Sequence, residues 1–68
     1  MIQSYTVNGD ARPWRAGTTV DAIVTDAGID GRWVAVAVDG VVVPSSRWPD
    51  TAVPPGSAVD ILQPCQGG

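Results

Sequence analysis

The sequence contains no histidine, no lysine and no glutamate among its 68 residues. Without histidine, the chain has no imidazole that could bind a metal ion, complete a Ser-His-Asp triad or serve as a general base. Without lysine, it can form neither a Schiff base nor an isopeptide bond through a side chain. Aspartate, serine, threonine, one tyrosine and one cysteine remain, which is a poor set of groups for catalysis. We therefore expect a protein that is not itself an enzyme.

Positive charge and cysteine are also scarce. Four arginines are scattered among seven aspartates, and the net charge of −3 disfavours binding to nucleic acid, which needs a basic face against the phosphates. The single cysteine, Cys65, excludes an intramolecular disulfide and a cysteine-rich zinc site. Pairs of aspartates such as Asp26 and Asp30 lack the spacing of a calcium loop, and we interpret them as solvated surface carboxylates. We expect no bound metal or cofactor.

Long apolar runs are missing as well. No run approaches the length of a membrane span, and the first five residues lack the charged-then-apolar plan of a signal peptide. We therefore expect a cytoplasmic protein without a membrane partner. With 68 residues and 44% apolar content, the chain can form one small domain near the lower size limit for a stable core. We place this domain at residues 1–63 and a flexible C-terminal tail at residues 64–68.

The first half of the sequence predicts a hairpin followed by a helix. Residues 3–7 alternate polar and apolar side chains, Asn8-Gly9-Asp10 is typical of a tight turn, and residues 11–15 form the return strand. Thr18 is the predicted N-cap of the helix, paired with an aspartate three residues later, and Gly28 is its predicted end. The apolar face of the helix consists of residues at i, i+3, i+4 and i+7: Val20, Ile23, Val24 and Ala27.

The second half predicts three more strands. Residues 33–38 alternate bulky and small side chains, and an Asp-Gly turn leads from them to a strand at residues 41–43. Residues 45–55 are irregular and rich in proline, with Trp48 as their anchor, and residues 58–62 form the last strand. The element order is therefore ββαβββ, an α+β fold in which one helix crosses a small mixed sheet. We expect the last strand to insert beside the first.

The alternation also divides the sheet into two faces. The valines of residues 33–38 point toward the helix, so Ala35 and Ala37 form a flat opposite face. Leu62 lies on the outward side of the last strand, next to the tail, and is predicted to be an exposed apolar residue.

The tail ends in two glycines, Gly67 and Gly68. A C-terminal glycine is the least hindered acyl group that a polypeptide offers, and without Cβ atoms the end of the chain can enter a narrow channel. Small residues are also common at chain ends that have no function. Cys65 is open to two interpretations: an exposed thiol available for redox or acyl-transfer chemistry, or a tolerated small residue.

Short motifs follow one another in a characteristic order across nearly the whole chain. They are Val7-Asn8-Gly9, Ala16-Gly17-Thr18-Thr19-Val20, residues 34–40, Val43-Pro44, Arg47-Trp48, Gly56, Val59-Asp60-Ile61-Leu62 and Gly67-Gly68. In this order and spacing they resemble the ubiquitin-like β-grasp sulfur carriers of the ThiS/MoaD type, and most closely the ThiS branch of thiamine biosynthesis. A carrier for molybdopterin or another sulfur pathway stays open as an alternative. A ubiquitin-like interaction module with incidental glycines is a third interpretation.

The resemblance implies a protein co-substrate rather than an enzyme. An E1-like adenylyltransferase of the ThiF type would use ATP to adenylate Gly68, while Gly67 gives access to its active site. A persulfide enzyme would then supply sulfur to make a thiocarboxylate, which a thiazole synthase of the ThiG type consumes. No cofactor is bound by the carrier itself. Ala35, Ala37 and Leu62 are our candidate docking patch for these partners.

Two positions depart from the family pattern. Ser57 follows the glycine that we match at Gly56, where family members often have an acidic residue, so the geometry of this turn is open. Cys65 stands where small apolar residues are common in the family, and a role for its thiol cannot be carried over.

Overall fold

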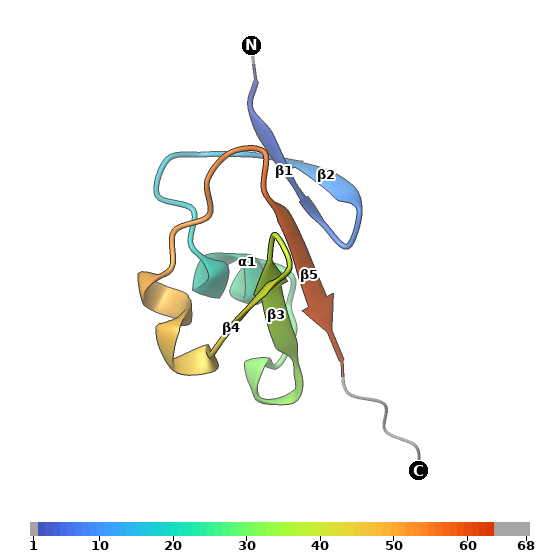
Figure 1. The fold of residues 1–68 in the computed structure, drawn as a ribbon, viewed down its shortest axis with the longest axis vertical. Coiled ribbons are helices and arrows are strands. Elements are labelled where there is room, and N and C mark those ends of the chain that lie inside the picture. Colours follow the sequence, from blue (N-terminus) through green and yellow to red (C-terminus); the bar gives the residue numbers. More distant parts are fainter. Residues whose placement is uncertain (1, 64–68) are drawn as a thin grey trace.

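The computed structural model describes residues 2–63, which form one sheet, one α-helix and two short 3-10 helices (Figure 1). In chain order the elements are β1 (Ser4–Val7), β2 (Asp10–Pro13), α1 (Val20–Asp26), η1 (Gly31–Trp33), β3 (Ala35–Val38), β4 (Val41–Val43), η2 (Ser45–Asp50) and β5 (Ala58–Leu62). The strand order is β2-β1-β5-β3-β4. β5 runs parallel to β1, and the other neighbouring pairs are antiparallel. The predicted β-grasp fold is confirmed, including the insertion of the last strand beside the first.

Both hairpins turn through two residues that have positive φ angles. Asn8 and Gly9 have φ angles of 51° and 88°, and Asp39 and Gly40 have φ angles of 51° and 83°. Turns of this kind match the right-handed twist of the strands, and asparagine, aspartate and glycine adopt them most readily. The two predicted turns are therefore confirmed, and local sequence alone specifies them.

Helix α1 begins one residue later than predicted, because Thr19 and not Thr18 is its N-cap. Thr19 has an extended backbone, and its Oγ1 accepts a hydrogen bond from the Ala22 N–H at 3.2 Å. It also forms an isolated β-bridge with Ala52, which keeps the chain extended up to this point. The Thr18 hydroxyl instead donates to the Arg15 carbonyl oxygen at 2.6 Å. The predicted capping pair between Thr18 and an aspartate is wrong.

The end of α1 agrees with the predicted stop at Gly28, which has a φ angle of 72°. The apolar face is shorter than predicted. Ala27 is exposed because α1 ends at Asp26 and Ala27 is its C-cap. The buried residues of the helix are Val20, Ile23 and Val24.

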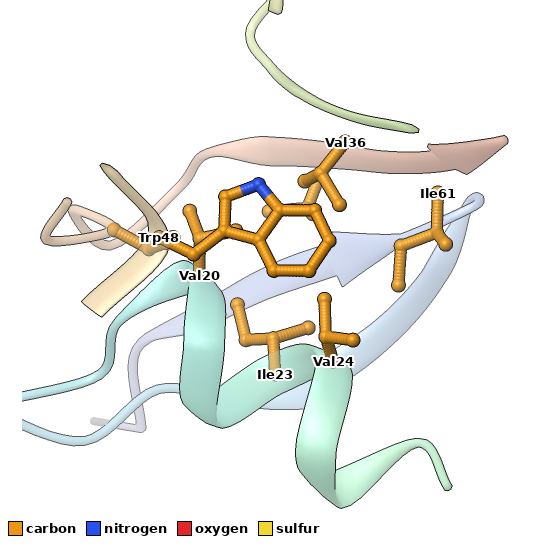
Figure 2. Close-up of a cluster of buried hydrophobic side chains, with 8 residues drawn as sticks. Val20, Ile23, Val24, Val36, Trp48 and Ile61 are labelled. Atoms are coloured by element: carbon orange, nitrogen blue, oxygen red, sulfur yellow. The ribbon is translucent and has the colours of Figure 1, made fainter. Parts of the chain in front are cut away.

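The core lies between α1 and one face of the sheet, and Trp48 packs within it (Figure 2). Trp48 is only 5% exposed, and its Nε1 donates a hydrogen bond to the Val43 carbonyl oxygen at 2.8 Å. A Cβ on Gly31 would lie 2.7 Å from Cζ3 of this ring, so only glycine fits there. Trp48 therefore does more than anchor an irregular segment. The buried cluster is Val20, Ile23, Val24, Val36, Trp48, Val53, Val59 and Ile61.

Two local details bear on the predictions: the start of β3, and the geometry of the turn before β5. Trp33 was expected to start a strand, but it lies in η1 and is 59% exposed. The turn before β5 has Gly56 at a φ angle of 83°, and Ser57 is buried at 4% exposure. The Ser57 carbonyl oxygen accepts a hydrogen bond from the Thr6 N–H at 3.0 Å, so a backbone contact joins the residue before β5 to β1. Within residues 2–63, no helix has the length and apolar character needed to cross a membrane.

Candidate functional site

Residues 2–63 present no cluster of acidic or cysteine side chains that could hold a metal ion. Asp26 and Asp30 are both exposed, as predicted. Asp30 forms an exposed ion pair with Arg32, with 2.8 Å between Oδ2 and Nη2. The side-chain and backbone hydrogen bonds from Arg32 lower the pKa of Asp30 to about 2. This exposed pairing stabilises a surface loop rather than a reactive group.

An open groove of about 460 Å³ lies between α1 and the first hairpin. Two arginines and one aspartate contribute its charged groups. It is remote from the end of β5, because Thr6 pairs with Ala58 at the start of that strand and Tyr5 lies one residue further away. The groove is lined by Tyr5, Arg12, Pro13, Arg15, Thr18, Ala22, Ile23 and Asp26.

The open face of the sheet contains the predicted docking residues. Ala35 is exposed and pairs across the strands with Leu62, which is 59% exposed, as expected. Ala37 is on the same face, but it is buried at 9% exposure, so its prediction as an exposed residue is wrong. Its small side chain lies between two cross-strand neighbours, Asp60 and Val42.

Val42 is the apolar residue of this face that the sequence did not identify. It is 66% exposed and pairs with Ala37. In a run of three valines the alternation gives no sign of which side chain points outward, so only the strand register assigns it. We call Ala35, Val42 and Leu62 the open-face patch.

The central strand β5 leads toward the predicted reactive end. Its last residue is Leu62, and Gln63 is the last residue that the structure describes. The predicted functional residues Cys65, Gly67 and Gly68 lie outside the described residues. The domain therefore positions the start of the tail through the middle strand of the sheet, which is paired on both sides.

One side chain that was not predicted as part of the site holds β5 near its end. The Asn8 carboxamide contacts the backbone of Ile61 twice: Oδ1 accepts from the Ile61 N–H at 2.8 Å, and Nδ2 donates to the Ile61 carbonyl oxygen at 3.3 Å. The sequence assigned Asn8 to the turn alone. No local signal could reveal the second role, because the two residues are 53 positions apart.

A family model and a solved structure identify the same family. A model described as the ThiS family matches residues 5–68. The crystal structure of the thiamine biosynthesis protein ThiS from Geobacter metallireducens is 26% identical, with a TM-score of 0.76 over 96% of this chain and 99% of that one. A thiazole synthase from Paramagnetospirillum magneticum is 36% identical over 62 residues, which are 91% of this chain but 19% of that protein. The chain thus spans about a fifth of the length of this curated relative.

Proposed function

The chain belongs to the ThiS family, and we propose that it is a sulfur carrier for the thiazole ring of thiamine. The reacting atom in this proposal is the carboxyl carbon of Gly68. Gly67 provides access to narrow active sites because it has no Cβ atom. The protein acts as a co-substrate and supplies no catalytic side chain. The observation that carries the proposal is the family match, which extends through the domain to residue 68.

The proposed chemistry begins with activation of an unreactive group. A carboxylate is ionised at neutral pH and is a poor electrophile. An E1-like adenylyltransferase of the ThiF type joins it to AMP from ATP and releases pyrophosphate. The terminal sulfur of a persulfide on a donor enzyme then attacks the adenylate and displaces AMP, which leaves an acyl disulfide. A second thiol cleaves the S–S bond of this intermediate, becomes part of a disulfide with the donor cysteine, and leaves a thiocarboxylate on Gly68. We propose a cytoplasmic location, where ATP for the first step is available.

The role of the folded domain is to present this end of the chain. Five residues follow Gln63, and a fully extended segment of that length spans roughly 16 Å. The open-face patch lies beside the point where β5 ends, because Leu62 belongs to both. We propose that partner enzymes dock on Ala35, Val42 and Leu62 while the end of the chain reaches into their active sites.

The names of the similar proteins favour the thiamine pathway over the molybdopterin pathway. The protein named thiazole synthase contains a segment similar to this chain within a longer polypeptide. Joining two proteins that act on one another raises their effective concentration, so such an arrangement is consistent with a carrier and its consumer. We propose that a thiazole synthase of the ThiG type is the acceptor of the sulfur.

Intact-mass analysis of the carrier tests the chemistry directly. The protein is incubated with ATP, the adenylating enzyme and a sulfur donor. We expect a gain equal to the mass difference between one sulfur and one oxygen atom, located at Gly68. A variant without Gly68 should stay uncharged yet folded, because a terminal residue contributes little to a core.

A matched variant, Cys65→Ser, keeps the length of the tail and removes only the thiol. Normal charging of this variant assigns the chemistry to Gly68 alone, whereas loss of charging gives the Cys65 thiol a part in sulfur transfer.

The pathway is tested by genetics. Deletion of the gene should produce a growth requirement for thiazole or thiamine and leave molybdoenzyme activity unchanged. Growth without thiamine together with loss of molybdoenzyme activity would assign the carrier to the other pathway.

A further inference from the structure

The ladder of hydrogen bonds between β1 and β5 stops before β5 does. The Thr6 N–H donates to the Ser57 carbonyl oxygen at 3.0 Å, and the Asn8 N–H donates to the Val59 carbonyl oxygen at 2.9 Å. The next residue of β5 on this edge is Ile61. The β1 backbone cannot reach it, because the chain has turned away at Asn8, where φ is 51°.

The Asn8 side chain takes the place of the missing strand. A carboxamide carries one N–H donor group and one carbonyl acceptor, as a peptide unit does. Its Oδ1 accepts from the Ile61 N–H at 2.8 Å, and its Nδ2 donates to the Ile61 carbonyl oxygen at 3.3 Å. The ladder is thereby extended by one residue toward the end of β5.

The hairpin between β3 and β4 has a similar arrangement, with one side-chain hydrogen bond to β5 instead of two. Asp39 also has a φ angle of 51°, and its Oδ1 accepts from the Ala58 N–H at 2.8 Å. The Ala58 carbonyl oxygen is already bonded to the Asp39 main-chain N–H at 2.8 Å. Ala58 therefore needs only an acceptor from the side chain, which aspartate provides. Ile61 needs a donor and an acceptor, which asparagine provides and aspartate at neutral pH does not.

We propose that Asn8 is a positioning residue that fixes the direction in which the chain leaves β5. Ile61 lies two residues before Gln63, the point from which residues 64–68 continue. On the opposite edge, Leu62 pairs with Ala35 of β3. Bonding on both edges holds the end of β5 in the plane of the sheet. The link to sulfur transfer rests on the proposed function, whereas the effect on β5 does not.

The substitution Asn8→Asp separates positioning from turn formation. Aspartate fits a turn of this type, as Asp39 shows, so a residue needed only for the turn should tolerate the change. If Asn8 positions the chain, Asn8→Asp should loosen the end of β5. A carboxylate oxygen would replace the Nδ2 donor and face the Ile61 carbonyl oxygen, and these two acceptors cannot bond to each other. The matched control is Asp39→Asn, which keeps its acceptor at the opposite end of β5.

The first measurement is the NMR order of the backbone amides of Leu62 and Gln63. Order should fall in Asn8→Asp and stay native in Asp39→Asn. The second is charging by the adenylating enzyme, for which we expect kcat/KM to fall about tenfold in Asn8→Asp, as displacement of a reacting group does. In the control Asp39→Asn, kcat/KM should stay within about twofold of the native value, since the substituted residue contacts the opposite end of β5.

Native order and native kcat/KM in Asn8→Asp would overturn the inference. If that variant does not fold, Asn8→Gly provides the second test, since glycine retains the turn and removes both bonds. In that case Asp39→Gly is the control, because it removes a bond at the other end of β5 and should reduce stability without reducing charging. If even the native protein is not charged, the proposed function fails, and the NMR measurement still decides the role of Asn8.

Discussion

The two faces of the sheet differ in what covers them, although the same strands supply both. On the covered face, Val59 and Ile61 of β5 pack with α1 and Trp48 and are at most 6% exposed. On the open face, Leu62 of the same strand is 59% exposed. Because side chains alternate along a strand, one residue can pack in the core while its neighbour points to the open face. Stability and partner recognition should therefore be separable by substitutions one residue apart.

The separation suits a protein that contributes its own chain end to a reaction. In the proposed function, the partner enzymes supply the catalytic groups. The covered face keeps a small domain folded, and the open face is our proposed surface for partner contacts. Substitutions on each face test this division, starting with the largest expected effect.

Truncation of Trp48 should be the most damaging change on the covered face. We expect Trp48→Ala to cost about 3–5 kcal/mol of unfolding free energy, the usual range for removal of a buried aromatic ring. A domain of this size has on the order of 5 kcal/mol in total, so the variant should be largely unfolded in urea titrations. Trp33→Ala is the control, because Trp33 is 59% exposed and should change stability by less than about 0.5 kcal/mol. Equal losses in the two variants would contradict the assignment of the core.

Adjacent residues of β5 provide the sharpest comparison of the two faces. Ile61→Ala should destabilise the domain by about 2–5 kcal/mol, because it leaves a cavity between the sheet and α1. Leu62→Ala should cost less than about 0.5 kcal/mol. Chemical denaturation of both variants measures the difference. A large loss for Leu62→Ala would mean that the open face contributes to the core.

A charge on the open face should affect partners rather than folding. We expect Leu62→Asp to lower kcat/KM for charging by at least about tenfold, since a charge in the apolar part of an interface is strongly unfavourable. The melting temperature should stay close to the native value. The matched control is Val41→Asp, because Val41 is 68% exposed but pairs with Val38, whose side chain faces the helix. Native charging by Leu62→Asp would remove this residue from the docking surface.

The smallest effect is expected from the surface ion pair of Asp30 and Arg32. The pKa of Asp30 falls from 3.8 to about 2 in the folded protein, so its contribution is complete above pH 3.8 and is lost as the pH falls toward 2. Solvent screens this exposed pair, and its contribution is correspondingly small. Melting curves of Asp30→Asn and of the native protein should therefore differ equally at pH 7 and pH 5. A difference that changes between these two values would show that another group titrates with Asp30.

Much of the fold follows from local signals in the sequence. The Asn-Gly and Asp-Gly turns need only residues that adopt positive φ angles, and the pairing of β5 with β1 follows from the order of the elements. The position of the N-cap could not be predicted between Thr18 and Thr19. Both are suitable caps, and a bridge to Ala52, far along the chain, decides between them.

The missed features of the candidate site depend on contacts between distant residues. Ala37 is buried because of its cross-strand neighbours, and Val42 is exposed because of the register of β4. Asn8 holds Ile61 across 53 positions, which no periodicity in the sequence reveals. The prediction that Gly68 is the reactive end rests on chemistry and family resemblance, and this residue lies outside the described residues.

The most direct test of the sulfur-carrier role is the mass of the intact protein before and after incubation with ATP, the adenylating enzyme and a sulfur donor. We expect replacement of one oxygen by sulfur at Gly68, and no replacement in the variant that lacks Gly68. An unchanged mass for the native protein, under conditions in which a known ThiS protein is converted, would contradict this role.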